Sequence, residues 1–448
     1  MTITSNQPKI EQTTDTLPSP EVEQQFNWKN CWYPVTFLQD LPKDIPYSFS
    51  LYDQPLVIFR NQDGKLVCLS DRCPHRAAKL SDGQVINGKI ECLYHGWQFG
   101  NDGECLHIPQ LAEELKIPNN ACVQSFYVVI KQGIIWFWRG KREEADENLI
   151  PILTDLEKPG FLKADFMLDL PYEQSYLIEN VMDPAHVSIS HHNTRGGGNR
   201  KNAQPLEMEV IKTSPLGICG KWRGQNKPND SWKFIDFIAP SLVLNTAYIQ
   251  SKNWSFGLAL YSLPMGKNHC RLLARGYRNF LNWDVKIRPR WLDHLNTNKI
   301  LEQDLLLIVG QQQQIEQLAQ NLQETYLPIK TSDTLVVEYR KWLDKYGVSL
   351  PFYQGYKTSH NIEKYSINIG TRLTRHTEIC SSCSQAYQKT IQLKQLFIAI
   401  AIALAAFAII TDSFKIQIGA VLVAILSVIL AFLASKVKNK FERSYTRH

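Results

Sequence analysis

Two short segments, each with one cysteine and one histidine, constrain this chain more than any other feature. The first reads Cys73-Pro74-His75 and the second reads Cys92-Leu93-Tyr94-His95. Thiolate sulfur and imidazole nitrogen are ligands for transition metals, so four such side chains predict a bound metal centre. A zinc site is one interpretation, because tetrahedral Zn²⁺ accepts two cysteines and two histidines.

The order of the ligands favours an iron–sulfur cluster over zinc. Zinc motifs usually group their two cysteines as one short pair and their two histidines as another. Here each segment instead supplies one ligand of each kind. A Rieske 2Fe–2S cluster needs this arrangement, because two thiolates hold one iron and two imidazoles hold the other. We therefore predict such a cluster, bound by Cys73, His75, Cys92 and His95.

The residues around both segments predict a small antiparallel β domain over residues 27–145. Residues 55–59 and 65–69 are apolar runs on either side of an Asp-Gly turn, which is typical of a hairpin. Residues 84–90 contain an Asn-Gly turn, and residues 126–138 predict two more strands. The metal-binding segments are therefore expected at hairpin tips. Residues 1–26 are polar and are expected to be a disordered tail.

Both segments resemble the Rieske domains of aromatic-ring-type oxygenases, with Cys-Pro-His-Arg first and Tyr-His-Gly-Trp-x-Phe second. Neither has the extra cysteine that forms a disulfide in the Rieske proteins of cytochrome complexes. The resemblance implies an α+β fold in which this β domain precedes a helix-grip-like catalytic domain with one non-haem iron. We assign residues 146–370 to that domain, since they mix strand-like runs with a predicted helix over residues 298–323.

Two histidines of the second domain are the best candidates for binding that iron. His186 and His191 are five residues apart, so a helix would align them only at a local π-type bulge. Two histidines this close are more often incidental, but after a Rieske domain they resemble the iron ligands of these oxygenases. An Fe(II) that activates oxygen also needs a carboxylate and open positions.

The carboxylate is expected far downstream, where the family has an acidic residue in a comparable helix. Asp304 lies on the apolar face of the predicted helix, where a carboxylate is unfavourable unless it is paired or metal-bound. Glu302 and a salt-bridged Asp304 are the alternatives. The resemblance also assigns Asp183 to the link between one subunit's cluster and the next subunit's iron, and Asn180 to the active site.

Further segments narrow the resemblance to pheophorbide a oxygenase and its relatives, which include a Rieske protein of the chloroplast import translocon and the lethal-leaf-spot proteins. These segments are residues 32–35, 108–110 and 202–210, and the likeness spans most of residues 27–435. Residues 1–26 have one Lys, no Arg and no apolar run, unlike an organellar transit peptide. We therefore expect a cyanobacterial-type member of the group.

Two apolar runs predict a transmembrane helical hairpin over residues 393–435. Residues 396–410 are apolar throughout, and residues 416–434 are interrupted only by Gln417 and Ser427. At ~1.5 Å per residue the runs span about 22 and 28 Å, slightly less than the hydrocarbon core, and a re-entrant pair is the alternative. Basic residues flank both outer ends, including the tail 436–448. Both ends and the metal domains are therefore expected on the cytoplasmic side.

A Cys-x-x-Cys motif, Cys380 and Cys383, precedes the hairpin in residues 371–392, which we expect to be a linker. In the resembled group this motif implies a thioredoxin-sensitive redox switch. A free dithiol or a weak metal site with His376 is the alternative. Ten cysteines in 448 residues do not indicate a disulfide scaffold, and a cluster bound by thiolates favours a reducing compartment.

These features predict a membrane-bound Rieske monooxygenase in a thylakoid or plasma membrane. We expect ferredoxin as the electron donor, O2 as the oxidant, a chlorophyll-derived tetrapyrrole as the lipophilic substrate, and a homotrimer as in the family. A non-catalytic redox-sensing subunit of a membrane complex and an oxygenase of another lipid are the alternatives. The net charge is only +6, and the sequence has no Lys/Arg stripe with interleaved aromatic residues, which argues against a nucleic-acid partner.

Overall fold

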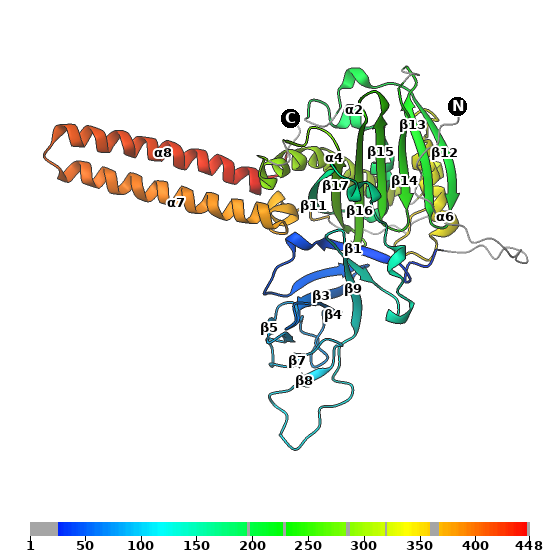
Figure 1. Ribbon diagram of the computed structural model, residues 1–448, viewed down its shortest axis with the longest axis horizontal. Coiled ribbons are helices and arrows are strands. Elements are labelled where there is room, and N and C mark those ends of the chain that lie inside the picture. Colours follow the sequence, from blue (N-terminus) through cyan, green and yellow to red (C-terminus); the bar gives the residue numbers. More distant parts are fainter. Residues whose placement is uncertain are drawn as a thin grey trace, which may run out of the picture.

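The computed structural model describes residues 26–194, 198–226, 230–283, 287–318, 320–358 and 367–445. The expected disordered tail, residues 1–26, lies outside these residues except for Phe26. Figure 1 shows a β domain, an α+β domain above it and a long helical hairpin that projects to one side. This arrangement confirms the expected fold class, an antiparallel β domain followed by an α+β domain and a C-terminal hairpin.

The N-terminal β domain contains two antiparallel sheets. The larger has the strand order β1-β10-β9-β4-β3-β2, and the smaller has the order β5-β6-β7-β8. Its strands are β1 (Trp32–Phe37), β2 (Tyr47–Leu51), β3 (Gln54–Arg60), β4 (Leu66–Ser70), β5 (Gln84–Ile86), β6 (Lys89–Glu91), β7 (Gln98–Phe99), β8 (Cys105–His107), β9 (Ser125–Lys131) and β10 (Ile134–Trp138). The expected hairpins are β3–β4, β5–β6 and β9–β10.

Strand β3 separates two hydrophobic cores. Because side chains alternate between the faces of a strand, Leu56 and Ile58 point to one side and Val57 and Phe59 to the other. Leu56 and Ile58 join a core that continues into the α+β domain. Val57 and Phe59 join a separate core that supports the two Cys-His segments. The β domain is thus packed against its neighbour on one side and holds the metal-binding loops on the other.

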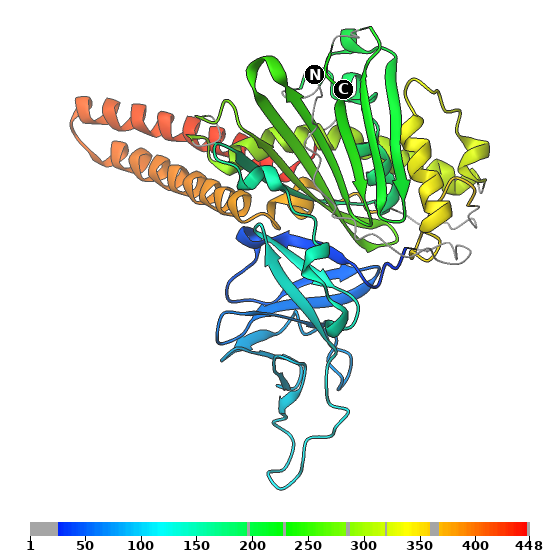
Figure 2. The same cartoon turned by 45° about the vertical axis from the view of Figure 1, so that its right-hand side comes forward.

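The α+β domain is organised around a seven-stranded antiparallel sheet with the order β11-β17-β16-β15-β14-β13-β12. Its strands are β11 (Leu162–Leu170), β12 (Leu206–Ser214), β13 (Gly217–Gly224), β14 (Lys233–Ile238), β15 (Leu242–Ile249), β16 (Trp254–Gly266) and β17 (His269–Arg278). Its helices are α1 (Gln174–Met182), α2 (Val187–Ser190), α4 (Arg290–Leu318), α5 (Leu322–Thr325) and α6 (Thr334–Tyr346). Figure 2 shows that α4 and α6 lie on the same face of the sheet.

Short helical turns connect these elements. They are η1 (Leu38–Asp40), η2 (Arg142–Glu144), η3 (Glu147–Leu149), η4 (Thr154–Glu157), η5 (Arg200–Asn202), η6 (Gln250–Lys252) and the π-helix η7 (Leu373–Thr377). The long helix α4 was expected over residues 298–323, but it begins and ends earlier in the chain. Its additional N-terminal turns carry His294, which is buried.

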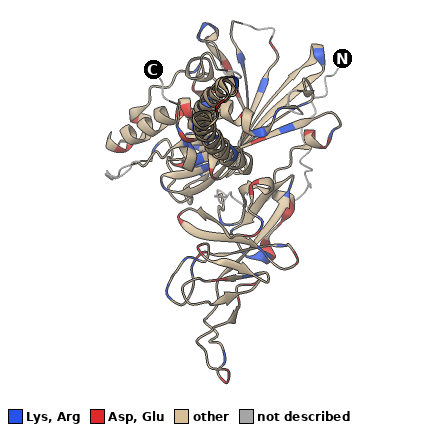
Figure 3. Cartoon of the chain, turned by 90° about the vertical axis from the view of Figure 1, so that its left-hand side faces the viewer, with Lys and Arg blue, Asp and Glu red and all other residues tan. Residues whose placement is uncertain are grey.

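The hairpin consists of α7 (Ser381–Ile410) and α8 (Phe414–Glu442), which pack along each other. Both are long and apolar enough to cross a membrane. Most of their apolar side chains are exposed, for example Ile409 at 84%, and such a surface is stable in hydrocarbon rather than in water. Figure 3 looks along the hairpin and shows long stretches without charged residues.

The hairpin helices extend beyond the expected residues 393–435 at both outer ends. Residues 371–392 were expected to be a linker. They instead contain η7 and the first turns of α7, and these pack on the α+β domain. Burial explains the difference. Residues such as Cys380 and His376 are buried, and buried backbone N–H and C=O groups need the hydrogen bonds that a helix supplies.

A buried arginine, ion-paired within the α+β domain, joins the two domains through a hydrogen bond. Arg275 on β17 donates to both carboxylate oxygens of Asp165 on β11, at 2.6 and 2.9 Å. Its remaining terminal nitrogen donates to the carbonyl oxygen of Gln132, in the β9–β10 turn, at 2.8 Å. The Arg275 side chain is completely buried. Removing it would leave the Asp165 carboxylate as an unpaired charge at the domain interface.

We expect Arg275→Ala to lower the free energy of unfolding by about 3–5 kcal/mol, as for other broken buried ion pairs. Urea unfolding followed by tryptophan fluorescence measures the change. The control is Lys131→Ala, which breaks a half-exposed pair with Glu147 and should change stability by less than about 1 kcal/mol. Equal shifts in the two variants would contradict the role given to Arg275.

Candidate iron centres

The two Cys-His segments form loops of the same backbone shape, one between β4 and β5 and the other between β6 and β7. In each loop, the N–H four residues after the cysteine donates to the cysteine carbonyl, at 3.0 Å from Ala77 and 2.8 Å from Gly96. Both of these residues have left-handed backbone, with φ of 59° and 74°. The matching turns present two thiols and two imidazoles to a common space at the tip of the domain.

The side chains in this space fit a 2Fe–2S cluster. The rings of His75 and His95 lie 4.4 Å apart between centroids. Nδ1 of His75 is buried and has no hydrogen-bond partner among the described residues, and such an atom is unfavourable unless it binds a ligand. Burial raises the pKa of the Cys73 thiol to about 11, and the neighbouring Cys92 adds to the shift. Iron binding would therefore have to displace the thiol proton.

The second candidate centre brings together the two histidines and the downstream carboxylate expected from the sequence. His186 and His191 are the N-cap and C-cap of α2. Asp304 projects from α4, and its Oδ2 lies 3.5 Å from Nε2 of His186 and 3.1 Å from Nε2 of His191. The three donor atoms lie within 4.8 Å of one another. The π-type bulge expected here is wrong, because a four-residue helix with a histidine at each end aligns the rings.

Hydrogen bonds to the outer ring nitrogens orient both histidines. Nδ1 of His186 lies 2.5 Å from the carbonyl oxygen of Asp183, whose carboxylate is 3.6 Å from the same nitrogen. Nδ1 of His191 lies 3.2 Å from the side-chain oxygen of Gln303. Each Nδ1 therefore carries a proton and each Nε2 faces Asp304, so a metal ion bound between them would replace any proton on Nε2.

The charges around this group favour a cation between the three side chains. Burial alone would lower the pKa of His186, but the carboxylates of Asp183 and Asp304 raise it to about 10. Burial alone would raise the pKa of Asp304, but the two histidines hold it well below its usual range. The hydroxyl of Ser190 donates to the other Asp304 oxygen. Two imidazoles and a carboxylate in such a setting fit Fe(II) with open positions.

The alternative ligand Glu302 lies in a different set of interactions. Its carboxylate accepts a hydrogen bond from Nε of Arg372 at 3.0 Å and from Arg375 at 3.4 Å. It also accepts the backbone N–H of Tyr445 at 2.7 Å. Glu302 is thus fully paired with the segment beside the hairpin, and Asp304 is the carboxylate that faces the histidines.

The Cys-x-x-Cys motif lies in a third group of possible metal ligands. Cys380 and Cys383 are buried beside His376 and His294. A site with His376 was one interpretation of the sequence, but no sequence pattern points to His294. No local spacing reveals it, because His294 lies on α4, far upstream of the motif. Asn180, expected in the active site, is half-buried near the end of α1.

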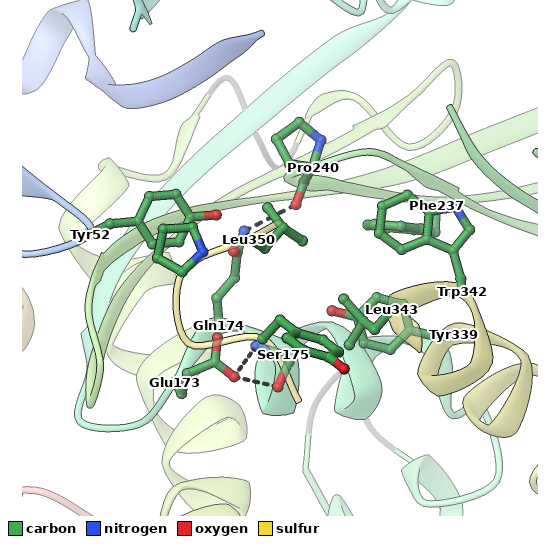
Figure 4. Close-up of a pocket in the computed structure, with 12 residues that line it drawn as sticks. Tyr52, Glu173, Gln174, Ser175, Phe237, Pro240, Tyr339, Trp342, Leu343 and Leu350 are labelled. Carbon is green, nitrogen blue, oxygen red and sulfur yellow. Dashed lines mark hydrogen bonds between the residues drawn. The ribbon is translucent and has the colours of Figure 1, made fainter. Parts of the chain in front are cut away.

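A small cavity lies at the start of α1 (Figure 4). Its volume is about 10 Å³, which holds at most one water molecule. Figure 4 shows the Glu173 carboxylate accepting the N–H of Ser175 at 2.8 Å. Burial raises the pKa of Glu173 to about 7. The cavity is too small for an organic substrate, and none of its lining residues belongs to the candidate iron centres.

Comparison with known families supports both domains. Residues 31–127 match the Rieske [2Fe-2S] domain, and residues 237–321 match the family described as pheophorbide a oxygenase. Protein TIC 55, chloroplastic, of Pisum sativum is 34% identical, over 88% of this chain and 78% of the relative. Pheophorbide a oxygenase of Oryza sativa subsp. japonica is 28% identical, over 95% of this chain and 86% of the relative. Chlorophyllide a oxygenase of Arabidopsis thaliana is 34% identical, over 72% of this chain and 59% of the relative.

Solved structures show the same fold. Dicamba monooxygenase bound to dicamba aligns with a TM-score of 0.57 at 24% identity, over 71% of this chain and 98% of that chain. NdmA of Pseudomonas putida CBB5 aligns with a TM-score of 0.57 at 20% identity, over 75% of this chain and 98% of that chain. In this fold, a Rieske domain precedes an α+β oxygenase domain, which is the order found here.

We expect Asp304→Ala to lower the iron content from about three to about two per chain, because the mononuclear iron would lose its carboxylate ligand. The electron paramagnetic resonance signal of the reduced 2Fe–2S cluster should remain, which shows that the chain is folded. Metal analysis of purified protein measures the iron. In the matched variant Glu302→Gln the iron content should stay at about three per chain. If Glu302→Gln loses iron and Asp304→Ala does not, Glu302 is the ligand.

The family matches and the fold confirm both expected cofactors, a 2Fe–2S cluster and a mononuclear non-haem iron. The side chains described above fit the two groups and lie in separate domains. The sequence identity to TIC 55 extends over most of both chains. The chain therefore belongs to the Rieske non-haem iron oxygenases, in the group that contains pheophorbide a oxygenase and TIC 55.

Proposed function

We propose that this protein is a membrane-bound monooxygenase that uses electrons from ferredoxin and O2 to oxygenate a chlorophyll-derived tetrapyrrole. The convergence of His186, His191 and Asp304 carries the proposal. A redox-sensing subunit would need the cluster alone, whereas this donor set leaves positions open for oxygen. When bound, the mononuclear iron supplies oxygen activation and the cluster supplies single electrons.

The protein's own residues hold and orient these two groups. Cys73, Cys92, His75 and His95 hold the cluster in this proposal. The Asp183 carbonyl and the Gln303 amide fix the rings of the iron-binding histidines through their Nδ1 protons. The burial of His191 and Asp304 keeps water away from the ligands. Asn180 lies one turn before Asp183, where it would contact substrate.

The shape of the molecule supports electron transfer between neighbouring chains. Figure 1 shows β5 and β7, which adjoin the cluster loops, in the lower part of the molecule and α2 near its upper end. An electron from one chain's cluster would therefore reach the iron of another chain. Leu93 and Tyr94, beside His95, are each 61% exposed, and apolar groups of this kind favour a protein contact. A head-to-tail contact of this type forms a ring when its rotation closes, and we propose such a ring of three chains, a homotrimer.

Asp183 is placed to connect the two centres across such a contact. Its carboxylate is half-buried and is already held near Nδ1 of His186 at 3.6 Å. The second carboxylate oxygen accepts the backbone N–H of Ala185 at 2.7 Å. A carboxylate in this position can accept a further hydrogen bond from His75 or His95 of a neighbouring chain. It would then join the cluster to the iron through one side chain.

The hairpin and the relatives support the class of substrate and the location. Two relatives are named for pheophorbide a and chlorophyllide a, which are tetrapyrroles related to chlorophyll. A hairpin in a thylakoid or plasma membrane would keep the enzyme beside such lipophilic molecules. The Lys and Arg residues at both outer ends of the hairpin support a cytoplasmic location of the metal domains.

We expect Asp183→Asn to reduce product formation about 10- to 100-fold, as for other residues that support a metal ligand. Ferredoxin should still reduce the cluster at the normal rate, because the cluster lies in the other domain. Stopped-flow absorbance measures cluster reduction, and product analysis measures turnover. The control is Asp155→Asn on η4, which should behave like the unaltered protein. Normal turnover in Asp183→Asn would contradict the proposal that Asp183 connects the cluster to the iron.

Labelled oxygen tests the proposed reaction. Reduced protein is incubated under ¹⁸O2 with pheophorbide a, chlorophyllide a and protochlorophyllide, and with a panel of sterols and other lipids. We expect one labelled oxygen atom in a tetrapyrrole product, and none with the Asp304→Ala variant. A labelled lipid product would favour the second oxygenase alternative. No product together with about two irons per chain would favour the redox-sensing subunit.

A further inference from the structure

A third group of metal-binding side chains lies where the hairpin meets the α+β domain. Its members come from the first turns of α4, from η7 and from the start of α7. They are His294, His376, Cys380 and Cys383, here called the anchor site. Each is at most 3% exposed. One donor atom from each residue lies within 4.8 Å of the other three.

The distances within the anchor site match those around a tetrahedral zinc ion. Nδ1 of His294 lies 3.4 Å from Sγ of Cys380 and 3.5 Å from Sγ of Cys383. Nε2 of His376 lies 3.3 Å from Sγ of Cys383. With Zn–S near 2.3 Å and Zn–N near 2.0–2.1 Å, sulfur and nitrogen ligands are about 3.5 Å apart. The four donors therefore surround a space of the right size without movement of the backbone.

Backbone carbonyls of β11 fix the proton positions on both histidines. Nε2 of His294 lies 2.8 Å from the carbonyl oxygen of Asp165, and Nδ1 of His376 lies 2.5 Å from that of Met167. A nitrogen that faces a carbonyl oxygen carries the proton. The other nitrogen of each ring then turns a free lone pair toward the sulfurs, which is the usual arrangement of zinc-binding histidines.

Cys380 lies where a thiolate is favoured, and a partner protein cannot reach either cysteine. Cys380 is the N-cap of α7 and Cys383 is in its first turn. The positive end of the helix dipole stabilises a thiolate at Cys380. Neither sulfur is in a disulfide, and both residues are 0% exposed. This burial argues against the thioredoxin-sensitive switch expected from the sequence, because thioredoxin must contact the sulfur that it reduces.

We propose that the anchor site binds one Zn²⁺ ion and fastens the membrane hairpin to the α+β domain. A closed set of two thiolates and two imidazoles is typical of structural zinc and leaves no position open for oxygen. The ion would tie the start of α7 to α4, the helix that also carries Asp304. Beside the site, Thr377 donates to the carbonyl oxygen of Phe441 at 2.7 Å, so the end of α8 is held at the same place.

Metal analysis of the full-length holoprotein in detergent tests the proposal. We expect about one zinc per chain in addition to the iron. The double variant Cys380→Ser/Cys383→Ser should lose the zinc and keep the spectrum of the 2Fe–2S cluster. The control Cys122→Ser, which changes an exposed cysteine, should keep both. Zinc retained by the double variant, or no zinc in the unaltered protein, would overturn the proposal.

X-ray absorption at the zinc edge tests the same site without any substitution, in case the double variant does not fold. The expected shell contains two sulfurs near 2.3 Å and two nitrogens near 2.0 Å. A shell of nitrogen and oxygen alone would overturn the proposal, as would a Cys380–Cys383 disulfide found by mass spectrometry of the protein as purified. Neither measurement depends on the substrate, so the zinc site and the oxygenase activity are tested separately.

Discussion

Helix α4 buries polar and charged side chains, and each of them is unfavourable in a core unless it meets a partner. Asp304 meets two histidines at the ends of α2, and Glu302 meets Arg372 beside the hairpin. Further toward the start of the helix, His294 meets a carbonyl of β11 and the two cysteines. These partners come from distant parts of the chain. The buried polar side chains of α4 therefore fix how the iron centre, the central sheet and the hairpin are placed.

The two domains divide the chemistry in a way that burial explains. The Cys-His loops lie at the tip of the β domain, and the exposed Leu93 and Tyr94 leave the cluster edge free to contact another protein. Asp304 and His191 are instead buried, where neighbouring charges act strongly because the surroundings are poorly polarisable. The cluster loops that would donate an electron and the residues that would bind the mononuclear iron thus lie in different parts of the chain. An assembly of several chains is therefore part of the proposed function.

Much of the fold and the cluster site could be predicted because their signals are local. Ligand spacing marks Cys73 and Cys92, and strand-like apolar runs mark strands such as residues 242–249, which form β15. Uninterrupted apolar runs mark the hairpin. Asp304 could also be found, since a carboxylate on an apolar helical face needs a partner. The choice between Asp304 and Glu302 as the iron ligand needed the tertiary structure, because Arg372, the partner of Glu302, lies far away in the sequence.

Other features depend on tertiary contacts that no local pattern contains. The alignment of His186 and His191 needed only a short helix, whereas their spacing suggested a bulge in a longer one. Residues 371–392 are polar enough to be mistaken for a linker, but their cysteines are buried by the α+β domain. His294 joins them only because α4 begins earlier than its apolar pattern indicates.

Mixed oligomers test most directly whether an electron passes from one chain to its neighbour. A Cys73→Ser chain, which lacks the cluster, is co-expressed with an Asp304→Ala chain, which lacks the mononuclear iron, and two different tags isolate the mixed species. Each variant alone should be inactive. In a three-membered ring, one cluster of the mixed species faces one intact iron, so we predict about one third of the normal rate of oxygenation. Mixed oligomers that carry both centres and remain inactive would contradict transfer between chains.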